Sequence, residues 1–389
     1  MNKKTNKIKI AIDAADLCYK RVDGTRIYIK NILNYLGKFS QKSRFYIYTK
    51  GNINSQLKFK IFDNYEIIRS HFPFFWTQLK FPFEIKRDKP RLLWMPLQTV
   101  PFLMPKNIKT IITVHDLAFK IFKKHFPLKD RILLNIFTYF ALKKADRIIA
   151  VSQNTKKDII KYYKTSPNDI EVIYHGYDKK IFNQKKAKNK KEIERVKKKY
   201  KIFGNYLLYA GALQPRKNLT TLLKAFDKLK DYYIYHSEFK DIKLVIAGPK
   251  AWLYQEIFDQ AKKSRYLRDI VFTGQYETQE LPYLMGGSEI FVFPSLYEGF
   301  GIPVLEAMAC ATPVVCAKNS SLTEVGGKAA LYFNEKNPTS LFNTMVEVLK
   351  DKKFKRKIIN KGLSQVENFS WEKSAKQTYG TMKKVISDS

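Results

Sequence analysis

Acidic residues and cysteines are both scarce in this chain, and each shortage restricts what the protein can be. Its 389 residues include 35 Asp and Glu against 72 Lys and Arg, a formal net charge of +37. The three cysteines, Cys18, Cys310 and Cys316, lie in apolar stretches and lack the spacing of metal ligands. This usage indicates buried thiols in a reducing compartment.

Targeting and membrane-spanning patterns are also missing. The first residues, MNKKTNKIKIAID, lead directly into an expected strand and lack the apolar core of a signal peptide. The run from Ile290 to Ala317 is long and apolar, but three prolines and two glutamates interrupt it, so we expect no transmembrane helix there. We expect a cytoplasmic protein, either soluble or peripheral at the inner face of the cell membrane.

The excess of basic residues has two explanations. It favours anionic partners such as nucleic acid, acidic lipid headgroups or phosphorylated substrates. It also fits the composition of an AT-rich genome, because Lys, Ile, Asn, Tyr and Phe are all plentiful. No RNA-binding or helix-turn-helix signature is present, so we expect no specific nucleic acid partner. A basic nucleic-acid-binding protein stays open as an alternative.

Short apolar strands alternate with helical patterns, which is typical of parallel α/β sheets. The length predicts two domains. They are 1–180 and 205–370, separated by a basic surface linker at 181–204 with a short helix near its end, and a C-terminal helix at 371–389 closes the chain. The aromatic segment 70–86 is expected to pass from a loop into a helix. The predicted strands are 8–14, 44–49, 65–70, 91–96, 109–116, 146–152 and 170–176 in the first domain, and 206–212, 243–248, 269–274, 289–295, 313–317 and 330–333 in the second.

The most informative stretch is FPSLYEGFGIPVLEAMACATPVV, residues 293–315. Glu298 and Glu306 bracket a Gly-Phe-Gly-Ile-Pro turn, and Pro303 suits the first position of a helix. Such a helix directs unpaired N–H groups and a partial positive charge toward a phosphate, while the two carboxylates accept hydrogen bonds from hydroxyls. On spacing alone, solvated or lysine-paired carboxylates explain the pattern about equally well.

This segment resembles the Glu, seven residues, Glu motif of retaining glycosyltransferases, and as a whole it is similar to glycosyltransferase family 4. The string Gly-x-x-x-Pro-Arg-Lys-Asn at 211–218, the His-Asp pair at 115–116 and VIYHGYD at 172–178 also match the family. The resemblance covers nearly the whole chain. It implies the B-type glycosyltransferase fold, with two Rossmann-like domains facing a central cleft.

The resemblance also implies roles for individual residues. Arg216 and Lys217 would bind the donor diphosphate and stabilise the leaving group, Glu298 would hold the donor sugar and Glu306 the ribose. His115 and Asp116 would face the acceptor and the reacting carbon, so the implied catalytic set is His115, Asp116, Arg216, Lys217 and Glu298. The implied donor-binding set is Gly211, Gly299, Phe300, Gly301, Glu306, Gln275 and Tyr276.

The segment RVDGTRIYIKNIL, residues 21–33, matches the family only in part. The family loop often carries two glycines, whereas here Gly24 stands alone. We expect a backbone contact from Gly24 to the acceptor or to a phosphate.

The expected reaction is transfer of a hexose from a nucleoside diphosphate sugar to a hydroxyl of a glycan or lipid-linked acceptor, with retention of configuration. GDP-mannose is the first choice of donor, from a mild resemblance at 247–257. We expect no cofactor and no metal, because Arg216 and Lys217 take the place of a cation and no Asp-x-Asp motif occurs. A B-fold nucleotide-sugar epimerase is an alternative. Basic and aromatic residues at 80–94 and 119–131 further suggest contact with an anionic membrane surface.

Overall fold

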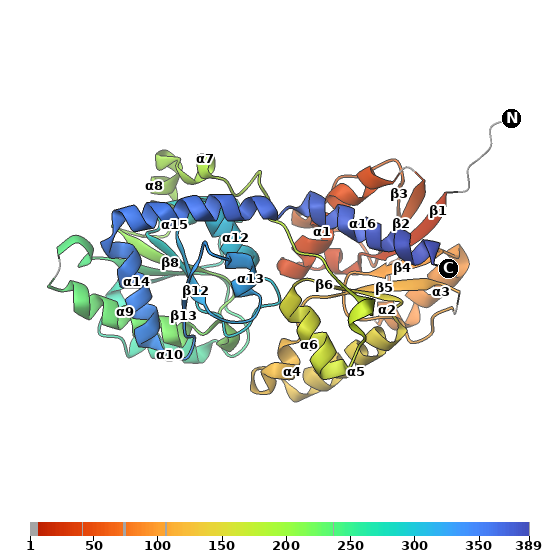
Figure 1. Ribbon diagram of the computed structural model, residues 1–389, viewed down its shortest axis with the longest axis horizontal. Helices are drawn as coiled ribbons and strands as arrows, with labels where there is room; N and C mark the ends of the chain where they lie inside the picture. Colours follow the sequence, from red (N-terminus) through yellow and green to blue (C-terminus); the bar gives the residue numbers. More distant parts are fainter. Residues whose placement is uncertain (1–6, 41, 73–74, 106, 236, 389) are drawn as a thin grey trace. The chain divides into compact units, whose positions relative to one another are not determined.

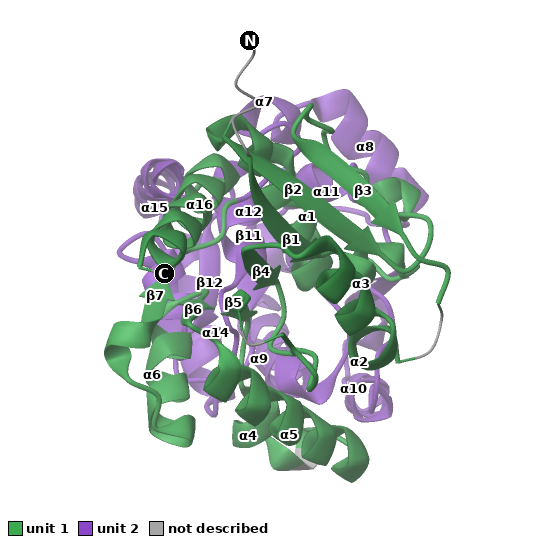
Figure 2. Cartoon of the chain, turned by 90° about the vertical axis from the view of Figure 1, so that its right-hand side faces the viewer, with its two compact units in different colours: residues 1–176, 370–389 green, residues 177–369 purple. Residues whose placement is uncertain are grey.

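The computed structural model describes residues 7–388, apart from 41, 73–74, 106 and 236, and divides the chain into two compact units. The first unit consists of Met1–Gly176 together with Ser370–Ser389, and the second is Tyr177–Phe369 (Figure 2). Each unit is built around its own parallel sheet with helices packed against it (Figure 1).

The sheet of the first unit has seven parallel strands in the order β3-β2-β1-β4-β5-β6-β7. Strand β4 is buried along its whole length, which explains why it is a continuous apolar run rather than an alternating one. All seven strands expected from the sequence are confirmed. They are β1 Ile8–Asp13, β2 Ser43–Thr49, β3 Tyr65–Arg69, β4 Leu92–Met95, β5 Lys109–Val114, β6 Arg147–Ala150 and β7 Ile170–Val172.

The α-helices described in this unit surround the sheet, and the last of them is contributed by the C-terminus. Helix α16 lies against α1 (Figure 1), and the hydroxyl of Thr381 in α16 donates to a carboxylate oxygen of Glu171 at 2.6 Å. The C-terminal segment thus completes the unit in which the chain begins. The described helices are α1 Gly24–Leu36, α2 Trp76–Leu79, α3 Phe81–Asp88, α4 Ala118–Ile121, α5 Leu128–Lys144, α6 Gln153–Tyr163 and α16 Trp371–Ser387.

The sheet of the second unit has six parallel strands in the order β10-β9-β8-β11-β12-β13. The strands are β8 Tyr206–Ala210, β9 Lys243–Ala247, β10 Ile270–Gly274, β11 Ile290–Phe293, β12 Val314–Ala317 and β13 Leu331–Phe333, and all six were expected. The described helices are α7 Gln184–Ala187, α8 Lys190–Lys199, α9 Leu219–Tyr233, α10 Gln255–Lys262, α11 Leu281–Gly286, α12 Ile302–Ala309, α13 Leu322–Gly326, α14 Pro338–Lys350 and α15 Lys352–Gln365.

The basic segment 181–204, expected as a surface linker with a short helix near its end, contains the two helices α7 and α8 and belongs to the second unit. Its helices α7 and α8 both pack against α11. Ala187 and Val196 are fully buried, and the α11 residue Gly286 lies so close to Ala187 that a Cβ there would overlap its carbonyl oxygen. Exposed lysines occupy the outer side of α8. In the sequence they outnumber the few apolar residues that pack this helix against the unit, so the helix was hard to recognise as part of it.

Candidate functional site

The strand order of the second unit reverses between β8 and β11, which is where open parallel sheets bind ligands. The loop after β8 carries Arg216 and Lys217, and the loop after β11 carries Glu298. The carboxyl ends of adjacent parallel strands meet at one edge. The fold therefore brings together side chains that are more than 80 positions apart in sequence.

Arg216, Lys217 and Glu298 form one ion cluster. Lys217 Nζ lies 2.5 Å from Glu298 Oε1, and an Arg216 guanidinium nitrogen lies 3.2 Å from Oε2 and also donates to the carbonyl of Tyr297. Burial alone would raise the pKa of Glu298, but the charges of Lys217 and Arg216 outweigh it and lower that pKa to about 2. Glu298 is thus ionised, and the three side chains together carry a net positive charge.

Two serines after β12 hold the Glu298 loop in place. The backbone N–H of Glu298 donates to Ser320 Oγ at 3.0 Å. The hydroxyl of Ser321, which is fully buried, is shared between the carbonyls of Glu298 and Phe300 at 2.8 and 2.7 Å. Neither serine was predicted from the sequence. The only signal there is a pair of small polar residues after a strand, which is common in loops.

Helix α12 begins directly after this loop, and Gly301 makes the turn possible. Gly301 has φ of 109°, which strains any residue with a side chain, and a Cβ there would lie 2.9 Å from Leu322 Cδ2. The helix starts at Ile302, so Pro303 occupies its second position rather than the expected first. The N-terminus of α12 therefore lies a few residues after Glu298 of the ion cluster, and a helix N-terminus favours binding of an anion.

Glu306 lies in the second turn of α12, and its environment is opposite to that of Glu298. The side chain is half-buried; burial first, and then the negative charge of Asp178, raise its pKa to about 8. Burial first, and then the charge of Glu306, raise the pKa of Tyr276, a half-buried residue after β10, whereas the neighbouring Gln275 is exposed. At neutral pH most Glu306 side chains carry a proton, so the group can donate as well as accept a hydrogen bond.

Gly211 directly follows β8 and brings its loop close to that of β9. Its φ is 153°, its N–H donates to the carbonyl of Ala247 at 2.9 Å, and a Cβ would lie 2.8 Å from the hydroxyl of Tyr209. The loop carrying Arg216 and Lys217 therefore leaves the sheet along a defined path.

Asn218 follows the two cations and anchors them to two other loops. It is the N-cap residue of α9, but its side chain makes no capping hydrogen bond to the helix backbone. Its amide group donates instead to the carbonyls of Pro294 and Glu335 at 3.1 and 2.9 Å, and its Oδ1 accepts from the hydroxyl of Thr221. Its φ of 56° lies in the left-handed region, which asparagine tolerates better than most residues.

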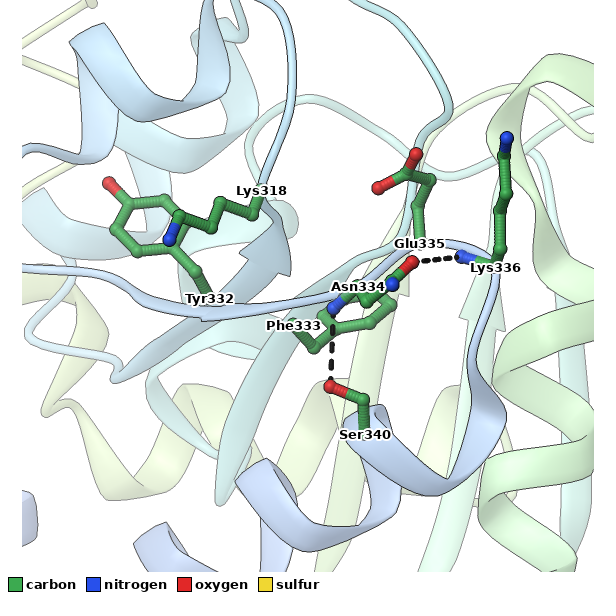
Figure 3. A pocket seen from close by; sticks show the side chains of 7 residues that line it. All are labelled: Lys318, Tyr332, Phe333, Asn334, Glu335, Lys336 and Ser340. Carbon is green, nitrogen blue, oxygen red and sulfur yellow. Dashed lines mark hydrogen bonds between the residues drawn. The ribbon is translucent and has the colours of Figure 1, made fainter.

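An open cavity of about 390 Å³ lies beside this anchor, at the carboxyl ends of β12 and β13. Its rim shares Glu335 with Asn218, and inside it the N–H of Lys336 donates to Asn334 Oδ1 at 3.0 Å (Figure 3). None of its residues belongs to the predicted site. The lining residues are Lys318, Tyr332, Phe333, Asn334, Glu335, Lys336 and Ser340.

In the first unit, His115 and Asp116 follow β5 as expected. His115 Nε2 lies 2.9 Å from the carbonyl of Pro96, which only accepts, so Nε2 carries the proton and Nδ1 is an acceptor. Burial lowers the pKa of His115 and keeps the ring neutral, and the ring of Tyr28 meets it edge-on at 4.9 Å. Asp116 accepts from the N–H of Ala118 at 3.0 Å, which fixes the turn after the strand.

Gly24 is the first residue of α1, and nothing in its surroundings requires a glycine. A Cβ at this position meets no atom within 4 Å. The preceding Asp23 accepts from the N–H of Arg26 at 3.3 Å and pairs with the Arg26 guanidinium. A phosphate approaching this helix end would compete with the carboxylate of Asp23, and the expected contact from Gly24 stays a prediction.

The described residues include no group of three or more His, Cys, Asp or Glu side chains arranged to hold a metal ion. Among them, no helix combines the length and apolar character needed to cross a bilayer.

Two family models match the chain in succession. Residues 23–180 match "Glycosyltransferase Family 4", and residues 185–365 match "Glycosyl transferases group 1". Together the two matches leave only short segments of the chain uncovered.

Individual proteins are similar to the chain at modest identity. "O-antigen chain mannosyltransferase B" of Escherichia coli is 28% identical over 285 residues, 72% of each chain. "Serotype-specific mannosyltransferase WbdA" of Escherichia coli is 26% identical over 294 residues, which is 72% of this chain but 33% of that longer protein. Among solved structures, sucrose-phosphate synthase from Thermosynechococcus elongatus superposes with a TM-score of 0.75 at 18% identity, covering 98% of this chain and all of the other.

Proposed function

Since this chain belongs to the family 4, group 1 glycosyltransferases and has their B-type fold, we propose that it transfers a hexose with retention of anomeric configuration and without a metal ion. The donor is a nucleoside diphosphate sugar and the acceptor a hydroxyl group of a glycan or lipid-linked saccharide. The ion cluster of Arg216, Lys217 and Glu298 at the switch point of the second sheet carries this proposal. Family membership decides against the epimerase and the nucleic-acid-binding protein.

The two cations receive the donor diphosphate. In the reaction the bond between the anomeric carbon and the diphosphate oxygen breaks, and negative charge accumulates on the leaving phosphate. Arg216 and Lys217, with the N-terminus of α12, stabilise that charge, and preorganised charges of this kind often account for most of an enzyme's rate enhancement. The acceptor oxygen bonds to the anomeric carbon on the face that the phosphate leaves, and the hydroxyl proton passes to the departing phosphate oxygen.

Glu298 holds the side chains of Arg216 and Lys217 in position before the donor binds. With a pKa of about 2 it is an acceptor only, so it accepts hydrogen bonds from donor-sugar hydroxyls while its salt bridges hold Arg216 and Lys217. A carboxylate held in this way loses little conformational freedom when the sugar binds.

Glu306 binds the ribose of the donor. Its pKa of about 8 leaves it mostly protonated at neutral pH, and a neutral carboxyl group donates to one ribose hydroxyl oxygen and accepts from another. It adds little negative charge beside the diphosphate at this pH, which favours binding of an anionic donor.

The donor we propose is GDP-mannose. The segment at 247–257 supports this choice, as do the relatives whose names specify mannosyl transfer. The name of the O-antigen relative also supports an acceptor that is a growing polysaccharide or its lipid-linked precursor. Work on such an acceptor would take place in the cytoplasm, at the inner face of the cell membrane.

A donor screen tests the proposal. Thermal shifts of the purified chain with GDP, UDP and ADP sugars identify the donor, because a ligand that binds only the folded state raises the melting temperature. Turnover of the positive donor with a saccharide acceptor follows, and NMR of the product reports its anomeric configuration. A product of inverted configuration, or no stabilisation by any of these sugars, would contradict the proposal.

A further inference from the structure

The outer side of α5 exposes a row of large apolar side chains that no part of the proposed reaction uses. Soluble proteins show scattered apolar residues on their surfaces, but seldom a continuous patch without a function. Eleven of the eighteen large apolar side chains that are exposed among the described residues lie between Phe75 and Phe140. Those on α5 are Leu128, Ile132, Leu133, Ile136, Tyr139 and Phe140.

A neighbouring loop extends this row. The ring of Phe102 stacks on Phe137 at 5.5 Å and meets Phe140 edge-on at 5.1 Å. Leu103, the next residue, is 78% exposed. We call the exposed apolar side of α5 together with Phe102 and Leu103 the α5 surface.

Helices α2 and α3 continue the apolar character on the other side of that loop. Phe75, Leu79 and Phe83 recur every fourth residue, and Phe75 and Phe83 are 75% and 71% exposed. Gln78 of α2 fixes this stripe to the loop, since its amide donates to the carbonyl of Val100 at 3.1 Å and accepts from the N–H of Phe102 at 2.9 Å.

The charge around these residues selects the partner. Segments 75–103 and 123–144 contain eleven basic and three acidic residues. Lys129, Lys143 and Lys144 are exposed on α5 itself. A second copy of the chain would bring the same positive charge against this one, which is unfavourable, whereas an anionic lipid surface would attract it.

We propose that the α5 surface, with the Phe75–Phe83 stripe beside it, docks the first unit on an anionic lipid bilayer. Apolar side chains enter the headgroup region while the lysine ammonium groups stay at the level of the lipid phosphates. The helix lies on the bilayer rather than across it, because charged residues occupy both of its ends.

This surface differs from the one expected on sequence. The expected segments 80–94 and 119–131 overlap it only in part, through the exposed Phe83 and Leu128. Phe81, Trp94 and Phe119 of those segments are buried in the core of the unit and contribute nothing to a membrane contact. The inference deepens the acceptor side of the proposed function, and it rests on that function only for the reason why a bilayer would be visited.

Vesicle co-sedimentation of the full chain tests the inference, with phosphatidylcholine vesicles that contain or lack phosphatidylglycerol. We expect the chain to bind the anionic vesicles at low salt, to release them as salt rises, and to ignore the neutral ones. Glutamine is a good helix former, so replacing Ile132, Leu133 and Ile136 by glutamine should preserve α5. The vesicle affinity should fall by tenfold or more, because three apolar side chains no longer enter the bilayer.

Matched variants in the second unit are the controls. Glutamine at Phe203, Ile234 and Tyr235 removes as many exposed apolar groups, and glutamine at Lys188, Lys190 and Lys191 matches a Lys129, Lys143 and Lys144 triple variant. Neither control should alter vesicle binding, whereas the α5 triple variants should. Equal losses in both units, or no binding of anionic vesicles at low salt, would overturn the inference.

Two further measurements separate membrane docking from other roles of this surface. If the α5 apolar variant changes only the oligomeric state in size-exclusion chromatography and leaves vesicle binding intact, the surface is a contact between copies and the inference is wrong. Turnover with a water-soluble acceptor should be the same in the variant and the natural chain. If neither chain turns over that acceptor while the natural chain still binds anionic vesicles, the proposed function is contradicted and the docking surface is not.

Discussion

Glu298 and Glu306 are eight positions apart, and their surroundings shift their pKa values in opposite directions. Two cations hold Glu298 ionised with a pKa of about 2, while burial and Asp178 raise the pKa of Glu306 to about 8. Carboxyl groups separated in this way take different roles at one pH. One is a permanent acceptor beside the phosphates, and the other is a neutral hydrogen-bonding group on α12.

Replacement of Lys217 by alanine should lower turnover by at least ~100-fold, since loss of one preorganised charge at a leaving group typically costs this much. Lys217 is largely buried against Glu298, so the loss also leaves Arg216 alone to offset the repulsion between that carboxylate and the donor. Steady-state kinetics measure the effect and circular dichroism confirms the fold. Lys185→Ala, an exposed lysine of α7, is the control. Natural activity in Lys217→Ala would remove this residue from the donor site.

Glu306 should give stability a particular dependence on pH. Its pKa rises from an ordinary 4.5 in the unfolded chain to about 8 in the fold. As pH increases from 4.5 to 8, the unfolded chain loses this proton before the folded one does, and the folded state is progressively disfavoured. Glu306→Gln removes the effect. Its melting temperature relative to the natural chain should therefore be higher at pH 8 than at pH 5.

The same substitution tests whether Glu306 acts as a neutral carboxyl group or as a carboxylate. Glutamine preserves a neutral donor and acceptor, whereas alanine removes both, so we expect activity near neutral pH to fall much further in Glu306→Ala than in Glu306→Gln. If both variants lose activity severely and equally, and their melting curves follow that of the natural chain at pH 5 and pH 8, then the carboxylate form of Glu306 is required.

At the scale of elements, the strands were predictable and the loops only in part. Most strands are short apolar runs ended by Gly, Pro or a polar residue, and burial on both sides of a parallel sheet demands such a run in the central strands. The basic segment at 181–204 was harder to interpret, because Ala187 and Val196 are few among many lysines. The support of Glu298 by Ser320 and Ser321 joins residues more than 20 positions apart and leaves no local pattern.

The donor-site residues themselves were identified by resemblance to a family, not by spacing. Spacing alone left lysine-paired carboxylates as an equal alternative, and Glu298 does pair with Lys217 in the structure. The pKa of Glu306 was also beyond prediction from sequence, since it depends on what the fold places around the carboxyl group.

The loop before α12 offers a matched pair of glycine variants. Gly301→Ala forces a side chain into a left-handed conformation and against Leu322, so it should destabilise the chain by roughly 1–2 kcal/mol or more. Gly24→Ala meets no atom within 4 Å at the start of α1 and should leave stability unchanged or slightly higher. Denaturant unfolding compares the two. Equal stabilities of the two variants would contradict the role given to the Gly301 turn.

Gly24→Ala also examines the expected backbone contact in the first unit. If an acceptor or phosphate approaches the Gly24 backbone closely, the added methyl group raises a Michaelis constant without lowering stability. Unchanged constants for both substrates would remove Gly24 from the site, in agreement with the carboxylate of Asp23 already present at that helix end.

At the scale of the whole molecule, the charge balance bears on the need for metal. The chain carries a net charge of +37, and the ion cluster adds a local positive charge to the roughly half charge of the α12 N-terminus. A donor diphosphate therefore enters a positive field even with Glu298 ionised. We expect turnover to persist in excess EDTA, measured with donor and acceptor at saturation. If EDTA abolishes turnover and Mg²⁺ or Mn²⁺ restores it, the cations of the chain do not suffice, and the roles given to Arg216 and Lys217 are wrong.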